Sequence, residues 1–145
     1  MIQRIQTLYL LLVVVLGTLL CVFSPVQFLL PEATEYVSLH AMDKWPMAVM
    51  TMAVPVLALV TIFLFKRRTL QIRLCAVEMV LLLGVLILYG LYYWFTIKSF
   101  ENFTLDHLQF GWAAPMPVVA LILTYLASRA IFKDEMLVRS LDRIR

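Results

Sequence analysis

Four long apolar stretches alternate with short polar segments along this chain of 145 residues. Each stretch has about 20 residues, enough for a helix to cross a hydrocarbon core of roughly 30 Å. The pattern predicts membrane-spanning helices over residues 5–24, 47–65, 70–97 and 112–132. Because little of the chain is left for a soluble unit, we expect one domain over residues 1–145. The predicted fold class is an all-α membrane protein with an antiparallel four-helix bundle.

The segments between the spans differ in length and character. Residues 66–69 form a very short turn, so the second and third spans must pack as antiparallel neighbours. The longer segment over residues 25–46 contains two β-favouring pieces, 26–30 and 35–40, which are compatible with a short β-hairpin. Residues 98–111 are expected to form a second loop on the same side as this hairpin.

The composition agrees with a membrane protein. The chain is 63% hydrophobic and only 14% charged, whereas a soluble domain is about half apolar and about a quarter charged. The net charge of +3 does not indicate a nucleic-acid partner, because the cations flank the spans and do not gather on one soluble face. The lipid bilayer is therefore the first expected partner.

The cations are distributed unequally between the two sides of the predicted bundle. Only Lys44 and Lys98 fall in the first and third loops. The other ten of the twelve Lys and Arg residues are Arg4, Lys66, Arg67, Arg68, Arg73, Arg129, Lys133, Arg139, Arg143 and Arg145. Positive charge in short loops stays in the cytoplasm. The bias predicts a multi-pass protein of the bacterial inner membrane with both termini cytoplasmic.

The cytoplasmic tail, residues 133–145, is predicted to continue the fourth span as an amphipathic helix. Its apolar stripe consists of Ile131, Leu137, Val138, Leu141 and Ile144. Asp134 falls within this stripe, which argues against a purely lipid-facing surface. Two interpretations remain open: a helix on the inner leaflet or against the bundle, and a docking helix for a cytosolic partner.

Glu78 is the one acidic residue inside a predicted span. A carboxyl group within the membrane indicates a functional site, and its partner must be identified. The expected partner is Arg129, which lies at a similar depth in the fourth span. An ion pair that locks two helices and a proton-coupled role for Glu78 both remain open.

Other chemistry-bearing residues give no convincing pattern. His40 and His107 fall in the outer loops without a third ligand at a metal-site spacing. Nucleotide-binding loops, zinc-protease motifs and nucleophile elbows are not found in the sequence. We therefore expect no cofactor, no metal and no catalytic residue, and we do not expect an enzyme.

Three stretches together resemble a known family. They are residues 1–12, MIQRIQTLYLLL; residues 68–74, RTLQIRL; and residues 134–145, DEMLVRSLDRIR. The chain resembles a bacterial family of small four-helix membrane proteins classed as domain of unknown function 4293. The resemblance implies a topology and no activity. It also directs attention to the cytoplasmic side, where the candidate interaction residues are Arg4, Gln6, Arg68, Gln71, Arg73, Asp134, Glu135, Arg139 and Asp142.

Two functions follow from these observations. The first is an inner-membrane interaction or assembly protein whose basic cytoplasmic face docks a membrane or cytosolic protein. The alternative is a small transporter that works as a parallel dimer with Glu78 as its proton-coupled group. The ten-to-two charge bias excludes a dimer of dual topology.

Overall fold

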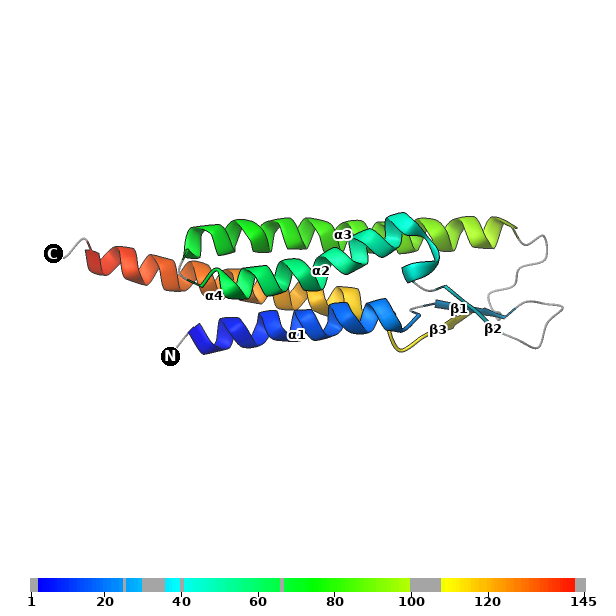
Figure 1. The fold of residues 1–145 in the computed structure, drawn as a ribbon, viewed down its shortest axis with the longest axis horizontal. Coiled ribbons are helices and arrows are strands. Elements are labelled where there is room, and N and C mark those ends of the chain that lie inside the picture. Colours follow the sequence, from blue (N-terminus) through cyan, green and yellow to red (C-terminus); the bar gives the residue numbers. More distant parts are fainter. Residues whose placement is uncertain are drawn as a thin grey trace.

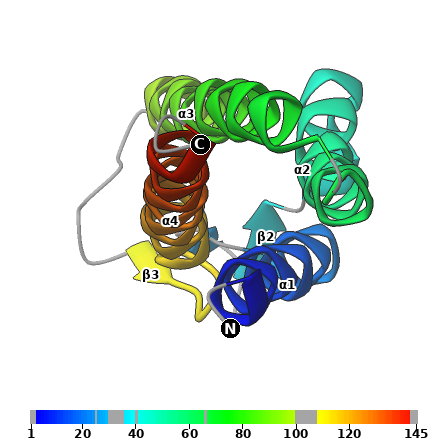
Figure 2. The same ribbon diagram turned by 90° about the vertical axis from the view of Figure 1, so that its left-hand side faces the viewer.

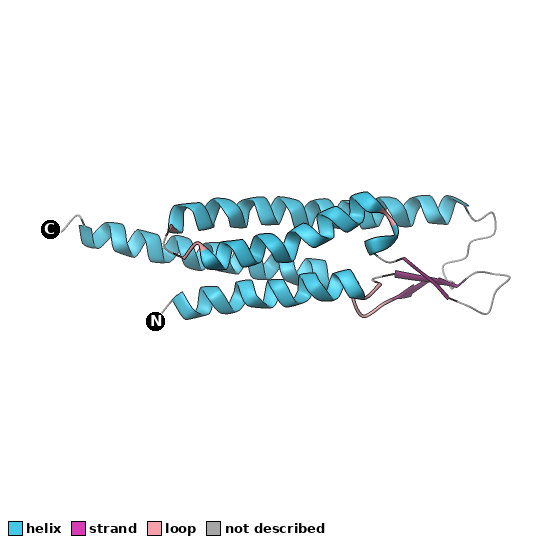
Figure 3. Cartoon of the chain, in the orientation of Figure 1, coloured by secondary structure: helices cyan, strands magenta, loops and turns pink. Residues whose placement is uncertain are grey.

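Four long helices form the body of the molecule in the computed structural model (Figures 1 and 3). The structure describes residues 3–24, 26–29, 36–39, 41–65, 67–99 and 108–142. The helices are α1 (Gln3–Val22), α2 (Trp45–Phe63), α3 (Arg68–Ser99) and α4 (Met116–Asp142). Each is long and apolar enough to cross a membrane, as predicted from the hydrophobic pattern.

Prolines explain where two helices begin. α2 starts at Trp45, and Pro46 occupies its first turn, where the missing N–H would have no partner in any case. α4 was expected from Trp112 but starts at Met116, because residues 112–115 form a turn ahead of it. Pro115 restrains the residue before it from helical geometry, which accounts for the later start. α4 then runs without a break to Asp142, so the described tail is one helix with the fourth span.

The helices form a four-sided ring (Figure 2). α1 packs against α2 and α4, and α3 packs against the same two helices from the opposite side. Both chain termini lie at one end of the bundle (Figure 1), which we call the terminal end. The loops that join α1 to α2 and α3 to α4 lie at the other end, which we call the sheet end.

A small sheet stands at the sheet end. It consists of β1 (Val26–Leu29), β2 (Tyr36–Leu39) and β3 (Leu108–Phe110), in the order β2-β1-β3, with both pairs antiparallel. β3 comes from residues that were expected to form a loop. A short 3-10 helix, Ala41–Asp43, follows β2 and leads into α2. The sheet thus connects the two loops through backbone hydrogen bonds.

Each helix turns one stripe of residues toward the bundle axis, and the stripe repeats at alternating steps of three and four. This heptad-like spacing is typical of helices that pack side by side at small crossing angles. The buried stripes are Gln6, Leu10, Val13, Gly17 and Leu20 of α1; Met47, Thr51, Val54, Ala58 and Thr61 of α2; Gln71, Cys75, Glu78, Leu82, Val85 and Tyr89 of α3; and Pro117, Ala120, Thr124, Ala127 and Ile131 of α4.

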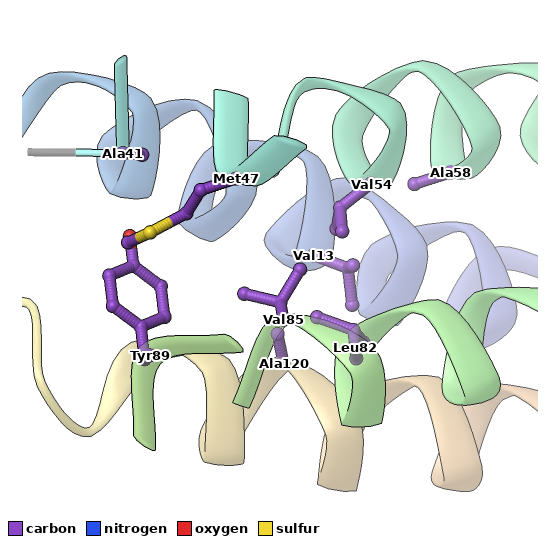
Figure 4. Close-up of a cluster of buried hydrophobic side chains, with 9 residues drawn as sticks. All are labelled: Val13, Ala41, Met47, Val54, Ala58, Leu82, Val85, Tyr89 and Ala120. Atoms are coloured by element: carbon purple, nitrogen blue, oxygen red, sulfur yellow. The ribbon is translucent and has the colours of Figure 1, made fainter. Parts of the chain in front are cut away.

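Two apolar clusters fill most of this interior. The larger one occupies the half nearer the sheet end, where side chains from all four helices point toward one another (Figure 4). The smaller one lies nearer the terminal end and consists of Leu10, Cys75, Ala127 and Ile131. The outward faces of the helices carry exposed apolar side chains, as expected for surfaces that face lipid.

Gly17 allows α1 to approach α2 closely. A Cβ atom at this position would lie 2.9 Å from Cδ of Pro55 and 3.3 Å from its backbone nitrogen. Glycine is therefore required by the close contact and not by its backbone conformation, since the described glycines have no positive φ. Small residues at helix interfaces favour this kind of packing in membranes.

Candidate functional site in the bundle interior

Polar residues occupy several positions of the inward stripes. Among the described residues, those that are buried are Gln6, Ser24, Thr51, Thr61, Gln71, Glu78 and Thr124. Polar groups are costly in an apolar interior unless they find hydrogen-bond partners. Their partners therefore distinguish residues that hold the bundle together from residues that are left available.

Gln71 caps the end of α2. Its Nε2 donates to the carbonyl oxygen of Thr61 at 2.9 Å. Thr61 lies in the last turn of α2, where the carbonyls have no N–H donor from the next turn. The amide of Gln71 supplies that donor and joins α3 to α2 at the terminal end.

Two further contacts tie α4 to its neighbours at the same end. The Nε2 of Gln6 donates to the carbonyl oxygen of Ala130 at 3.1 Å and joins α1 to α4. Arg68 and Asp134 form an ion pair between α3 and α4, with 3.0 Å between Nη1 and Oδ2. The same Nη1 also donates to the backbone oxygen of Asp134 at 3.4 Å. Polar contacts therefore join all four helices at the terminal end.

The ion pair explains why Asp134 interrupts the apolar stripe predicted for the tail. Asp134 follows Ile131 by three residues and continues the inward stripe of α4, while Arg68 precedes Gln71 by three residues on α3. Both charged residues are thus the next positions of stripes that face the bundle axis. The stripe predicted from the tail alone mixed buried Ile131 with exposed Leu137 and Val138.

A pocket of about 240 Å³ opens beside these contacts. Its walls come from α1, α3 and the end of α2, and they combine amide, hydroxyl and guanidinium groups with apolar side chains. The lining residues are Gln6, Thr7, Leu10, Ile62, Phe65, Arg68 and Gln71. The pocket brings together two of the motifs that carry the family resemblance, the start of the chain and the turn at residue 68.

The other candidate interaction residues lie elsewhere at this end. Arg73 and Glu135 line a second groove, of about 230 Å³, between α3 and α4. The side chains of Arg4, Arg139 and Asp142 lie outside the described part of the structure. Four motif residues, Gln6, Arg68, Gln71 and Asp134, are engaged in contacts within the chain, so the predicted interaction face is partly a set of internal contacts.

Glu78 lies deep in the interior. Its side chain is fully buried, at 0% exposure, and neither carboxyl oxygen has a hydrogen-bond partner among the described residues. It is ten residues beyond Arg68, which corresponds to about 15 Å along the helix. If Arg68 marks the membrane interface, this depth is close to the middle of a ~30 Å hydrocarbon core.

The surroundings of Glu78 follow from the helix register. Counting seven residues inward from the contact between Gln71 and Thr61 places Glu78 level with Val54 of α2. Counting ten residues from the ion pair at Arg68 places it level with Thr124 of α4. The hydroxyl of Thr124 donates to the carbonyl of Ala120, so its hydrogen is already used within its own helix.

The predicted ion pair between Glu78 and Arg129 is wrong. Arg129 lies on the exposed side of α4, whereas Glu78 faces the bundle axis. Neither the depth nor the rotation of Arg129 fits. By the register of the Arg68–Asp134 ion pair, Arg129 lies five residues, or about 7 Å, nearer the terminal end than Glu78. Arg129 is two residues beyond Ala127, a step of about 200° around the helix, which turns its side chain away from the axis.

Within the part of the chain that the structure describes, Glu78 is therefore a single carboxyl group without a charged partner. Among the described residues, it is the only buried Asp, Glu, Lys or Arg. The titratable side chains that share the interior are Cys75 on the preceding turn of α3 and, toward the sheet end, Tyr89 and Cys21. The described part of the chain contains no group of three or more residues that could hold a metal ion. A carboxyl group in such surroundings is the kind of group that can carry a proton or pair with a single cation.

Several interior residues were not singled out from the sequence. Gly17, Thr51 and Thr124 belong to inward stripes, and the hydroxyls of Thr51 and Tyr89 have no hydrogen-bond partner among the described residues. Small or polar residues at steps of three and four within each apolar stretch are the signal that would have located them. Hydrophobicity alone does not, because lipid and a protein core accept the same apolar side chains.

Four helices long and apolar enough to span a membrane, packed in a ring around a mainly apolar interior with a few buried polar residues, indicate a small helical membrane protein. The chain belongs to the family described as Domain of unknown function (DUF4293), whose sequence profile matches residues 2–144. No curated protein matches the chain, and no solved structure matches it. The resemblance noted in the sequence is thereby confirmed over nearly its whole length.

Proposed function

We propose that this chain is a proton-coupled transporter of the inner membrane in which Glu78 binds a proton and a cationic cargo in turn. The observation that carries the proposal is the complete burial of Glu78 without a hydrogen-bond partner among the described residues. A buried carboxylate requires a counter-charge, a set of donors or a bound proton. Because a proton and a cation compete for the same charge, one carboxyl group is sufficient to couple their movements.

The position of Glu78 favours a site within one copy of the chain. Its helix stripe faces the axis of its own bundle and not the outer surface. The parallel dimer considered from the sequence is thus not needed to complete the site.

The orientation that we propose for the protein places both termini in the cytoplasm. Its support is the excess of Lys and Arg at the terminal end, to which Arg67, Arg73 and Lys133 contribute exposed side chains. A C-terminal fusion to a fluorescent protein should be fluorescent in living cells. A fusion of an exported phosphatase at the same position should be inactive, and an active one would reverse the orientation.

Transport is tested with purified protein in liposomes. The probes are the lipophilic cations ethidium and tetraphenylphosphonium, driven by an imposed pH gradient. Wild-type protein should exchange protons for at least one probe, and Glu78→Gln should abolish the exchange because the amide carries no charge. Glu135→Gln is the matched control, since it makes the same chemical change at the terminal end and should leave exchange intact.

Two results would contradict the proposal. One is gradient-driven uptake by Glu78→Gln at the wild-type rate. The other is a wild-type protein that moves neither probe and also fails to react with dicyclohexylcarbodiimide at Glu78. That reagent modifies protonated carboxyl groups in apolar surroundings, so it reports proton binding without any knowledge of the cargo.

A second candidate function is the docking of a cytosolic protein by the end of α4. The observation in its favour is that α4 projects beyond the other helices at the terminal end (Figure 1). Its side chains there include exposed Met136, Leu137 and Val138. These three consecutive residues spread around the helix, and exposed apolar side chains on a projecting helix can enter a groove of a partner protein.

Docking is tested by crosslinking in cells. A photo-reactive amino acid at position 137 should capture one defined protein, whereas the same label at exposed Val80, which lies within the span on α3, should not. Capture of lipid alone at both positions would exclude docking and would indicate a membrane-associated tail.

A further inference from the structure

We infer that Glu78 exchanges its proton with the terminal end of the bundle, through the pocket lined by Gln6 and Gln71, and that Leu10 and Cys75 form the barrier along this path. The inference rests on the proposed function, because it assigns a direction to proton binding at Glu78. It is carried by the arrangement of polar groups and apolar packing on the two sides of this carboxyl group.

The first observation is the distance from Glu78 to polar surroundings on each side. Gln71, at the wall of the pocket, is seven residues away on the same stripe, or about 10 Å along the helix. In the other direction the stripe of α3 continues through Leu82 and Val85 before it reaches Tyr89, about 16 Å away. The single hydroxyl of Thr51 on α2 lies between these levels, and it is fully buried. The polar end of the bundle is thus nearer on the pocket side.

The second observation is the unequal thickness of the two apolar clusters. On the pocket side, the buried cluster consists of Leu10, Cys75, Ala127 and Ile131, and two of these side chains are small. By the register that places Glu78 level with Val54, Ala58 of the larger cluster also lies on the pocket side. On the sheet side that cluster contributes bulkier side chains, among them Met47, Leu82 and Tyr89 (Figure 4). A thin and partly small-residue layer is the easier one for water to cross in a brief opening.

The third observation identifies the residues that control the barrier. Leu10 belongs both to the wall of the pocket and to the smaller cluster. Cys75 lies in that cluster and one turn before Glu78 on the same stripe. Water that enters the pocket reaches the carboxyl group through the layer that Leu10 and Cys75 share. Arg68, at the mouth, is held by its ion pair with Asp134, which keeps the guanidinium at the rim.

Cys75 provides a native reporter for this path. The chain has two cysteines, Cys21 and Cys75, so Cys21→Ser leaves a single thiol. The reagent is the charged, membrane-impermeant (2-sulfonatoethyl) methanethiosulfonate, which forms a mixed disulfide with a thiol only where water admits it. It is added to sealed vesicles of known orientation, and intact-protein mass spectrometry gives the modified fraction over time.

The expected result is modification of Cys75 from the terminal side and none from the sheet side. Leu10→Ala should accelerate the reaction several-fold, because it removes the bulk of the barrier. Leu82→Ala is the matched control: it removes the same atoms on the far side of Glu78 and should not change the rate. The uncharged, permeant methyl methanethiosulfonate should modify Cys75 in vesicles of both orientations, which establishes that the thiol is reactive.

The inference is overturned if the charged reagent reaches Cys75 from the sheet side. It is equally overturned if the charged reagent, added from the terminal side, modifies Cys75 neither in the Cys21→Ser protein nor in the Cys21→Ser/Leu10→Ala double variant. The permeant reagent must modify Cys75 in both proteins for this result to count. The transport proposal is judged separately by the liposome assay. If Cys75 is inaccessible but exchange still depends on Glu78, only the proposed proton path is wrong. If Cys75 is accessible from the terminal side but Glu78→Gln still exchanges at the wild-type rate, the proposed function is wrong and the access path stands.

Discussion

Arg68 and Asp134 form an ion pair of 3.0 Å between α3 and α4 at the terminal end of the bundle. Arg68 lies three residues before Gln71 on α3, and Asp134 lies three residues after Ile131 on α4. The inward stripes of the two helices therefore end in opposite charges. The side chains of Arg68 and Asp134 are 25% and 15% exposed, which places the pair between a surface salt bridge and a buried one. It holds α4 in the rotation that the rest of its stripe requires.

Loss of either partner should destabilise the bundle. We expect Asp134→Ala and Arg68→Ala each to lower the free energy of unfolding by about 1–3 kcal/mol, because the remaining charge is left partly buried. The double variant should cost less than the sum, with a coupling energy of about 0.5–3 kcal/mol. Unfolding of the detergent-solubilised protein in a denaturant series measures all three variants. Strict additivity would show that the two side chains do not interact in solution.

Gly17 should be sensitive to a single methyl group. Gly17→Ala places a Cβ 2.9 Å from the ring of Pro55, and such overpacking costs about 1–3 kcal/mol. Gly90 is the control, because a Cβ there meets nothing within 4 Å, and alanine is the better helix former by up to about 1 kcal/mol. Melting temperatures in detergent should therefore fall for Gly17→Ala and hold or rise for Gly90→Ala. Equal shifts would contradict the close approach of α1 and α2.

Glu78 should limit the stability of the protein. Glu78→Met keeps the length of the side chain and removes a buried carboxyl group that has no hydrogen-bond partner among the described residues. We expect it to raise the free energy of unfolding by about 1–3 kcal/mol, while exchange in liposomes is lost. A functional group that costs stability is the expected trade-off at an active site. If Glu78→Met instead unfolds the protein, the carboxyl group has a structural role.

The projecting end of α4 should be dispensable for the bundle. A chain that stops after Glu135 retains the ion pair at Asp134 and loses the described residues 136–142, among which Met136, Leu137 and Val138 are exposed. Its melting temperature should match that of the full chain, whereas Asp134→Ala in the full chain should melt lower. A large loss of stability on truncation would mean that the tail folds back against the bundle.

The number of helices, their approximate limits and the membrane setting were predictable from the sequence. About 20 apolar residues in a row must form a helix in a bilayer, because the backbone has no other means to satisfy its hydrogen bonds there. The ends shifted where local chemistry decides, as at Pro115, where a turn precedes α4. The third strand, Leu108–Phe110, was missed because three residues carry too weak a pattern and pair only with a distant segment.

The candidate site was predictable in part. Glu78 was found because a carboxylate within an apolar span is conspicuous in any sequence, and the ends of the chain were recognised by their motifs. The partners were not found: Arg129 was expected to face Glu78 and points outward, whereas Asp134 was noted without its partner and pairs with Arg68. Position along one helix can be counted from the sequence, but the register between two helices and the rotation of each about its axis cannot.

The sequence by itself thus determined how many times the chain traverses the bundle and where its charges concentrate. Both properties depend on transfer of single residues between water and lipid, and they add along the chain. Only the tertiary structure decided which side chains meet, since an apolar face has a similar free energy against lipid and against another helix. The choice of face comes from packing between helices, where Gly17 admits Pro55, Gln71 caps α2, and Glu78 is enclosed without a partner among the described residues.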